Sequence, residues 1–279
     1  MKKIIVHGGK AHLDDFLVTC LALRQYGVLP VERREPTSEE IEDVTVLVLD
    51  VGNRHDPENN NFDHHQLERG TAECATSLFA QNVRYGGDEY AITLDELLGL
   101  TKWYETLKAI DSGGPFTWAK SKGVDASLIF ELASPVQEAL ILMFEKGAVV
   151  PRSLVDVMRS IGQQIVAQLY SRYCRIDELG GKIRVIELKG LKGYVLMEAD
   201  KEGLFLWRER NLPDAAFNIT FDDRGPGFQL FRESDHPRID FTRVKDDIEV
   251  SFAHASGFIA KTRTKNIEVA LRLVERAIV

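Results

Sequence analysis

The run Val44–Leu49 (VTVLVL) constrains the fold most, because it presents apolar side chains to both faces of a strand. Burial on both faces is typical of a central strand in a parallel sheet that carries helices on each side. A shorter apolar run, Ile4–Val6, precedes His7, and the apolar spacing over residues 14–26 fits a helix that ends at Gly27. The chain is therefore predicted to begin with an α/β domain.

The pattern of apolar residues changes near residue 180. Helical spacing recurs over residues 75–85, 94–110, 126–146 and 153–173. Alternation typical of strands follows over residues 182–188, 193–197, 217–221, 227–231 and 248–252, with an amphipathic helix over 267–279. We predict a catalytic α/β domain of residues 1–178 with a mainly parallel sheet, and a smaller α+β domain of residues 179–279.

Composition bounds the class of protein and its partners. The chain has 279 residues, a formal net charge of −8 and three well-separated cysteines, Cys20, Cys74 and Cys174. Such cysteines argue against a disulfide framework or a thiolate zinc site and favour a cytoplasmic protein. No stretch has the length and apolarity of a signal peptide core or a membrane span. An acidic chain does not coat long duplex nucleic acid, so a nucleic-acid partner should be short or single-stranded.

Histidines and aspartates gather after the predicted strands of the first domain. Five of the seven histidines lie within the first 65 residues. Ligands of open parallel sheets bind at the carboxyl ends of the strands, where loops converge. The residues expected there are His7, His12, Asp14, Asp50 and the triplet Asp63-His64-His65. Gly8 and Gly9 allow a tight turn after His7.

This residue mix predicts a metal centre. Carboxylates combined with neutral imidazoles suit manganese, iron or zinc, whereas a magnesium site is usually all oxygen, and manganese is the first choice. With Asp111 at the end of a predicted helix, at least six candidate ligands are present. If one carboxylate bridges, two ions roughly 3.5 to 4 Å apart can activate a water for attack on phosphorus.

Each of these residues also has an ordinary structural explanation. His7 or His12 alone would more often be a polar loop histidine, and Asp50 would serve equally well as a helix cap. Asp111 at a helix end is common without any function. The complete set in this order is much harder to attribute to chance than any single member.

Three stretches carry a resemblance to known proteins: His7–Asp15 (HGGKAHLDD), Asp50–Gly52 with Phe62–Gln66 (FDHHQ), and His254–Ile259 (HASGFI). On these stretches the chain resembles the DHH phosphoesterase superfamily, which is named for the motif present here as Asp63-His64-His65. Within it the chain is similar to the Myg branch (melanocyte proliferating gene family) of metal-dependent hydrolases. The resemblance spans nearly the whole chain and implies a DHH-type catalytic domain followed by a DHH-associated-like domain.

The resemblance also implies roles for individual residues. His7, His12 and Asp50 would hold one ion, and a second ion would be held by Asp14, Asp50, His64 and Asp111. Asp63 would orient a ligand histidine, and His65 would contact the phosphate or assist proton transfer. The broad superfamily has an aspartate where this chain has His12, although the Myg branch also has histidine there. The preferred ion and the pH optimum therefore stay open.

The C-terminal domain is expected to bind the substrate across the cleft. Residues 258–279 hold five Lys+Arg against two Asp+Glu, and hydroxyl and backbone donors near Ser256 suit phosphate. The candidate substrate-binding residues are His254, Ser256, Gly257, Lys261, Arg263 and, less directly supported, Arg208. The alternatives are a solvated charged face for the cations, a core position for His254, and a contact with Glu209 or water for Arg208. Trp207 and Phe258 would stack on bases or pack in the core.

Together these features favour a metal-dependent phosphoesterase. The Myg resemblance implies a 3′-to-5′ exonuclease that acts on RNA or short oligonucleotides with two divalent ions. A small-molecule phosphatase or pyrophosphatase using the same metals is the alternative enzyme, and a nucleotide-binding regulatory module without turnover is the alternative from another class. The oligomeric state stays open, a homo-oligomer included.

Overall fold

The apolar run of the first domain lies at the centre of a sheet. In the computed structural model, which describes residues 1–68, 71–86, 91–131, 134–198 and 200–279, strand β3 (Val46–Leu49) is completely buried. It lies between β1 (Lys3–Val6) and β5 (Asn61–Phe62) and runs parallel to both. The sheet continues with β2 (Val31–Arg33), parallel to β1, and with β4 (His55–Asp56), the antiparallel edge strand. The α/β class and the mainly parallel sheet are therefore confirmed.

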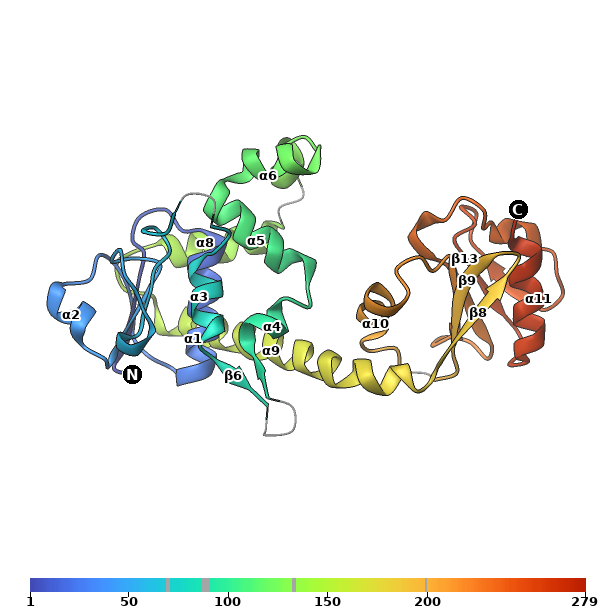
Figure 1. The fold of residues 1–279 in the computed structure, drawn as a ribbon, viewed down its shortest axis with the longest axis horizontal. Coiled ribbons are helices and arrows are strands. Elements are labelled where there is room, and N and C mark those ends of the chain that lie inside the picture. Colours follow the sequence, from blue (N-terminus) through green and yellow to red (C-terminus); the bar gives the residue numbers. More distant parts are fainter. Residues whose placement is uncertain (69–70, 87–90, 132–133, 199) are drawn as a thin grey trace. The chain divides into compact units, whose positions relative to one another are not determined.

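Helices cover this sheet on both sides. Helix α1 (Leu13–Tyr26) contacts β1 and β3, and it packs together with α3 (Ala75–Gln81) and α8 (Pro135–Glu145), whereas short α2 (Ser38–Glu42) lies on the other side (Figure 1). Helix α9 (Arg152–Gly180) crosses α1 closely. A Cβ at Gly162 would lie 2.2 Å from the carbonyl oxygen of Cys20, so the close approach requires glycine.

Several predicted helix limits in this part of the chain were wrong. The helix expected over 75–85 ends at Gln81, because β6 (Arg84–Tyr85) pairs with β7 (Ile92–Thr93). The helix expected over 94–110 is divided into α4 (Leu94–Leu98) and α5 (Lys102–Gly113). The helix expected over 126–146 corresponds to α7 (Ser127–Glu131) and α8, with residues 132–133 outside the described residues. One further helix, α6 (Pro115–Lys122), precedes them, and the first residue of α8 is a proline. Proline is favoured at a first helical position, so the sequence contained this signal.

The chain divides into two compact units, Met1–Tyr170 (unit 1) and Ser171–Val279 (unit 2). The division falls inside α9, as does the boundary expected at about residue 178, and the assignment of a separate role to each part stays a prediction. In the part of the chain that the structure describes, no helix combines the length and apolarity needed to span a membrane.

Unit 2 is built on a second sheet with helices on both faces. Its strands lie in the order β12-β13-β11-β10-β9-β8, and β9 and β10 are its parallel pair. The strands are β8 (Ile183–Leu188), β9 (Leu191–Leu196), β10 (Phe217–Phe221), β11 (Phe228–Arg232), β12 (Val250–Ala253) and β13 (Ile259–Thr262). The strands expected over 217–221 and 227–231 are present as β10 and β11, which pair antiparallel.

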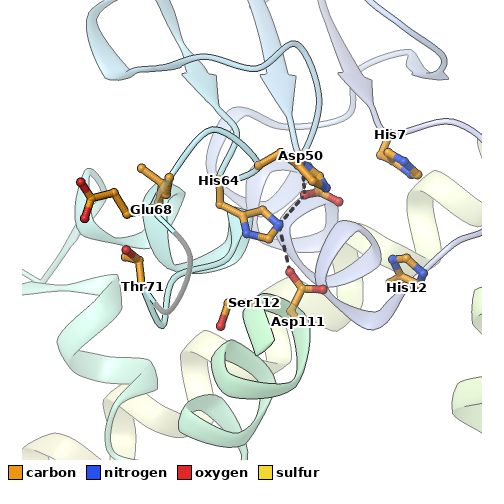
Figure 2. Close-up of a pocket in the computed structure, with 10 residues that line it drawn as sticks. His7, His12, Asp50, His64, Glu68, Thr71, Asp111 and Ser112 are labelled. Carbon is orange, nitrogen blue, oxygen red and sulfur yellow. Dashed lines mark ion pairs between the residues drawn. The ribbon is translucent and has the colours of Figure 1, made fainter. Parts of the chain in front are cut away.

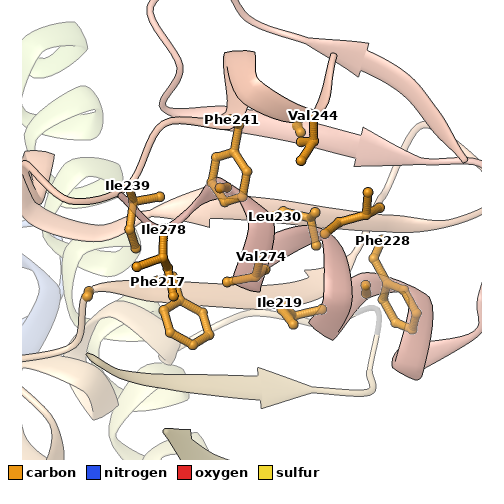
Figure 3. Packing of buried hydrophobic residues seen from close by; sticks show 14 of the residues in the cluster. Phe217, Ile219, Phe228, Leu230, Ile239, Phe241, Val244, Val274 and Ile278 are labelled. Atoms are coloured by element: carbon orange, nitrogen blue, oxygen red, sulfur yellow. The ribbon is translucent and has the colours of Figure 1, made fainter. Parts of the chain in front are cut away.

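Two cores flank this sheet. On one face, helix α11 (Ile267–Ala277) packs on Phe217, Phe228 and Phe241 (Figure 3). On the other face, the end of α9 and helix α10 (Leu204–Asn211) bury Trp207 against Tyr194. Of the two roles expected for Trp207, stacking on bases or packing in the core, the structure shows core packing, because the residue is only 6% exposed.

Candidate metal centre

The carboxyl ends of three adjacent parallel strands deliver the candidate ligands to one pocket. His7 follows β1, Asp50 follows β3, and the Asp63 triplet follows β5, while Asp111 comes from the last turn of α5. The pocket has a volume of about 340 Å³ (Figure 2). Its lining residues are His7, His12, Asp50, His64, His65, Leu67, Glu68, Thr71, Asp111 and Ser112.

The backbone at Asp50 adopts an unusual conformation that belongs to the site. Its φ is +57°, in the left-handed region that aspartate and asparagine tolerate better than most residues. The amide of Asp50 donates to the carbonyl of Phe62 at 3.0 Å, which ties the end of β3 to β5. The side chain, only 3% exposed, therefore turns out of the strand and into the pocket (Figure 2).

His64 lies between two carboxylates. Its Nε2 is 3.3 Å from Asp50 Oδ1 and 3.1 Å from Asp111 Oδ2. Burial disfavours the imidazolium, but the close approach of the Asp111 and Asp50 carboxylates outweighs burial and raises the pKa of His64 to about 10. In the metal-free protein His64 is thus the cation of this cluster, and a metal ion must displace its proton in order to bind there.

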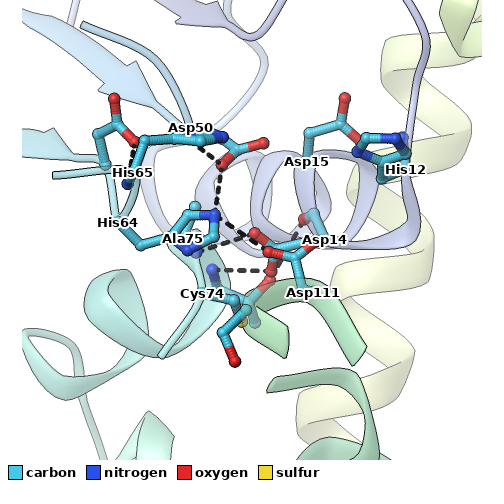
Figure 4. A network of polar contacts seen from close by, with 12 residues as sticks. His12, Asp14, Asp15, Asp50, His64, His65, Cys74, Ala75 and Asp111 are labelled. Carbon is cyan, nitrogen blue, oxygen red and sulfur yellow. Dashed lines mark hydrogen bonds and ion pairs between the residues drawn. The ribbon is translucent and has the colours of Figure 1, made fainter. Parts of the chain in front are cut away.

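Asp14 does not line the pocket, although its carboxylate lies close to His64 and Asp111. It is fully buried and accepts hydrogen bonds from the amides of Ala75 (2.8 Å) and Thr76 (3.1 Å), at the N-terminus of α3 (Figure 4). Burial, followed by the charges of Asp111 and Asp50, raises the pKa of Asp14 to about 7. Like charges held this close destabilise one another unless a cation lies between them.

The donor atoms in the pocket fit divalent ions. Three sets of side chains have ligand atoms within 4.8 Å of one another: Asp50 with His64 and His65, His7 with Asp15 and Asp50, and Asp14 with His64 and Asp111. Asp50 and His64 each belong to two sets. Within the described residues, buried His7 Nδ1, Asp50 Oδ1 and Asp111 Oδ2 make no well-aligned hydrogen bond, although both oxygens form ion pairs with His64 Nε2. Buried ligand atoms with spare bonding capacity are expected where a metal binds.

Asp63 contacts His65. Its Oδ1 lies 2.6 Å from His65 Nδ1 and accepts the His65 amide at 2.9 Å, while Oδ2 accepts the amide of Asn53 at 2.6 Å. The carboxylate is buried, whereas the His65 side chain is 49% exposed. The histidine that Asp63 orients is thus His65, and His64 has Asp50 and Asp111 as its neighbours.

His12 stands apart from the three sets. It caps the N-terminus of α1 and is exposed, and its ring centroid lies 6.3 Å from that of His7. Its amide donates to Asp15 Oδ1 at 2.8 Å. The structure therefore brings His12 to the rim of the pocket, next to His7 but farther from the carboxylates.

The sequence analysis missed a buried ion pair beneath the site. Arg33 Nη2 lies 3.1 Å from Asp15 Oδ2, and both side chains are at most 1% exposed. Arg33 also donates to the carbonyl of Gly9 at 3.1 Å and lies over the ring of Phe144. It thus fixes the turn after His7, where Gly9 has a φ of +75°. Its position at the end of β2 was the available signal, but that strand was not predicted.

The candidate substrate residues of unit 2 are distributed over different places. His254, Ser256 and Gly257 share the turn between β12 and β13, where His254 Nδ1 accepts the Ser256 amide at 3.1 Å. Gly257 has a φ of +69°, and a Cβ there would lie 2.2 Å from Asp240 Oδ1, so the turn requires glycine. The ring of His254 contacts Phe258, with centroids 4.5 Å apart.

The three basic candidates for substrate binding differ in burial and in their ion-pair partners. Lys261 Nζ pairs with Asp222 Oδ1 at 2.5 Å, and Arg263 is exposed. Arg208 is only 6% exposed and lies 2.7 Å from Glu209 and 3.7 Å from Glu233. Arg208 belongs to α10 and not to the β12–β13 turn.

Comparison with known proteins finds a similarity in the first part of the chain. The family model MYG1_exonuc, described as "Uncharacterised protein family (UPF0160)", matches residues 3–79. No curated protein and no solved structure matches the chain. The chain is thus similar to the MYG1 exonuclease family over the span from β1 to α3. That span contains His7, Asp50 and the Asp63 triplet, whereas Asp111 and unit 2 lie outside it.

Proposed function

We propose that this protein is a metal-dependent phosphoester hydrolase whose active site is the pocket of unit 1. One observation carries the proposal: buried ligand atoms of His7, Asp50 and Asp111 face one pocket, where the two carboxylate oxygens have the ion pair with His64 as their contact but no well-aligned hydrogen bond within the described residues. Imidazole with carboxylate suits manganese, iron or zinc, and manganese is our first choice. Two such ions would supply charge stabilisation at the phosphoryl oxygens and an acidified water.

The three overlapping ligand sets support a division of the site. We assign His7, His12 and Asp50 to one ion: His7 and Asp50 share a set, whereas His12 belongs to none of the three and is included because its ring lies beside that of His7. The other ion would be held by Asp14, Asp50, His64 and Asp111. Asp50 would be shared, in keeping with its place in two sets and its burial between them.

His65 and Asp63 would handle the proton of the reaction. Asp63 holds His65 Nδ1 at 2.6 Å, which fixes the ring and leaves Nε2 for the substrate. A carboxylate behind the imidazole also stabilises the protonated ring after it has taken a proton. Half of the His65 side chain is exposed, as a group that must meet a substrate requires.

For the substrate we propose RNA or short oligonucleotides, cleaved from the 3′ end. The similarity to the MYG1 exonuclease family over residues 3–79 supports this choice. A pocket of about 340 Å³ also suits one terminal nucleotide and not a duplex. His254, Ser256, Lys261 and Arg263 of unit 2 are proposed to bind substrate phosphates, with Gly257 shaping their turn.

The test is a time course with end-labelled RNA of about ten nucleotides and manganese. Wild-type protein should release mononucleotides from a free 3′ end, and a 3′-terminal block should stop the release. Asp50→Asn should lose this activity by at least about 100-fold. Glu58→Gln removes the same charge from an exposed site in the same segment and should retain full activity.

A small-phosphate phosphatase is the second candidate, because the small volume of the pocket also suits pyrophosphate or a nucleotide. Phosphate release from pyrophosphate or a nucleotide, with intact RNA, would assign that function instead. Manganese binding without turnover of RNA, dinucleotides or pyrophosphate would indicate a binding module.

A further inference from the structure

A second pocket lies wholly within unit 2, on the face of its sheet opposite α11. Strand β10 alternates between the two faces: Phe217 and Ile219 belong to the core under α11, whereas Asn218 and Thr220 line this pocket. Helix α10 provides its wall, and the volume is about 220 Å³. We call this cavity the α10 pocket.

The sheet register fixes the floor of the α10 pocket. Asn218 lies opposite Phe231 of β11 and beside Tyr194 of β9, and Thr220 lies opposite Gln229. All five side chains line the cavity. Central strands rarely carry this many polar side chains on a covered face unless those groups have partners.

Two polar atoms of the floor make no hydrogen bond in the part of the chain that the structure describes. Asn218 Oδ1 and Thr220 Oγ1 are buried, in residues that are 7% and 1% exposed. The neighbouring groups are satisfied: Glu233 Oε1 accepts from Tyr194 Oη at 2.5 Å and from Asn218 Nδ2 at 2.6 Å. The orientation of Asn218 is thereby fixed, with its carbonyl oxygen unused and available to accept a donor.

The walls combine aromatic surface with positive charge. Phe205 is 59% exposed, and the guanidinium of Arg208 lies 5.2 Å from its ring centroid. Lys201 lines the cavity and pairs with Asp223 at 3.0 Å, where the Asp223 side chain is 61% exposed. An anion could therefore compete with this partly exposed ion pair for Lys201.

We propose that the α10 pocket binds the base of a nucleoside monophosphate. A nucleobase supplies the ring donors that Asn218 Oδ1 and Thr220 Oγ1 lack, and its flat face suits stacking on Phe205. The phosphate suits Lys201. A cavity of about 220 Å³ matches a single base with part of its ribose.

This site is separate from the metal centre, because all of its lining residues belong to unit 2. Binding there requires neither metal nor turnover, so it goes beyond the proposed hydrolase function. It also accounts for Arg208, which lies in this pocket and apart from the β12–β13 turn.

Calorimetric titration of the full-length protein in EDTA tests the proposal. The probes are AMP, GMP, CMP and UMP, with ribose 5-phosphate and inorganic phosphate as ligands without a base. At least one nucleotide should bind with one-to-one stoichiometry and much more tightly than ribose 5-phosphate. Asp50→Asn should bind it as the wild type does.

Two variants locate the binding. Thr220→Val removes the hydroxyl with little change of shape and should weaken binding about fivefold, the effect of one hydrogen bond. Phe205→Ala should weaken it about fivefold or more through lost stacking. Phe252→Ala, at another exposed phenylalanine of the same sheet, is the matched control and should leave binding unchanged.

Three results would overturn the inference. The first is no binding of any nucleotide, and the second is equal binding of ribose 5-phosphate. The third is binding that is lost in Asp50→Asn but kept in Thr220→Val, which would place the nucleotide at the metal centre. If the wild-type protein binds a nucleotide at this pocket but does not cleave RNA, only the hydrolase proposal is contradicted.

Discussion

Both units bury carboxylates, but the groups that surround these carboxylates differ. In unit 2, Glu233 accepts hydrogen bonds from the neutral donors Tyr194 and Asn218, and the Arg208 guanidinium lies 3.7 Å from its other oxygen. In unit 1, Asp14, Asp50 and Asp111 face one another, and burial together with the neighbouring charges raises the pKa of Asp14 to about 7.

The difference shows which cluster is built for a cation. A buried carboxylate with neutral donors is complete without further partners. In unit 1 the single imidazolium of His64 offsets only part of the charge of several neighbouring carboxylates, and such a cluster is costly until a further cation is bound. The arrangement in unit 1 therefore suits a metal ion, and the arrangement in unit 2 suits a rigid pocket floor. Variants in either unit test this contrast.

The largest effect is expected for His65→Ala on turnover. Loss of a positioned acid–base group costs about 10²- to 10⁴-fold, and Asp63 holds this ring in place. We expect a fall in kcat within that range, with manganese affinity unchanged. His55→Gln, a histidine of edge strand β4 that does not line the pocket, is the control. Normal metal binding with full turnover in His65→Ala would show that His65 has no part in the chemistry.

Arg33→Met should cause the largest loss of stability. It leaves Asp15 buried without its partner, and breaking such a pair costs about 3–5 kcal/mol. The double variant Arg33→Met with Asp15→Asn should recover part of that loss, because no unpaired charge stays buried. Urea unfolding of both proteins in EDTA measures this. Equal stability of the single and double variants would mean that Asp15 is not charged in the folded protein.

The convergence of the candidate metal ligands on one pocket could largely be predicted from the sequence, whereas the buried ion pair behind them could not. Strand β3 and Asp50 could be predicted because a doubly apolar run indicates a central strand, and the residue after it lies at the edge of the sheet where ligands bind. Arg33 could not, because β2 has three residues, VER, with no apolar pattern. Only the pairing of β1 with β2 brings Arg33 towards Asp15.

The α10 pocket of unit 2 could not be predicted from the sequence for a similar reason. The alternation of β10 predicts that Asn218 and Thr220 share one face. Whether that face is covered depends on α10, whose apolar pattern is weak and which was not predicted. Local patterns thus predict strands and their faces, while pockets depend on contacts between elements far apart in sequence.

A smaller effect is expected when Asp50→Asn is tested for stabilisation by manganese. At a concentration of 100 times Kd, an ion that binds only the folded state adds about 2.7 kcal/mol. Wild type and Glu58→Gln should gain this, and Asp50→Asn should gain much less. Asparagine tolerates the left-handed backbone of Asp50, so the metal-free stability should change by no more than about 1 kcal/mol. Thermal unfolding with manganese or EDTA provides the comparison. An equal gain in stability in Asp50→Asn would show that Asp50 does not bind the ion.

The smallest effect is expected for Tyr194→Phe in unit 2. The change removes one of the donors to Glu233, while Asn218 continues to donate at 2.6 Å. We expect a loss of about 1–2 kcal/mol, less than for a carboxylate left without donors. Because Glu233 already has Arg208 nearby and needs no metal ion, the loss should be the same in manganese and in EDTA, as measured by urea unfolding. Tyr85→Phe, where the ring packs on Tyr170, is the control and should change stability by less than about 0.5 kcal/mol. If manganese restored the stability of Tyr194→Phe, the cluster around Glu233 would itself be a cation site, and the contrast between the two units would fail.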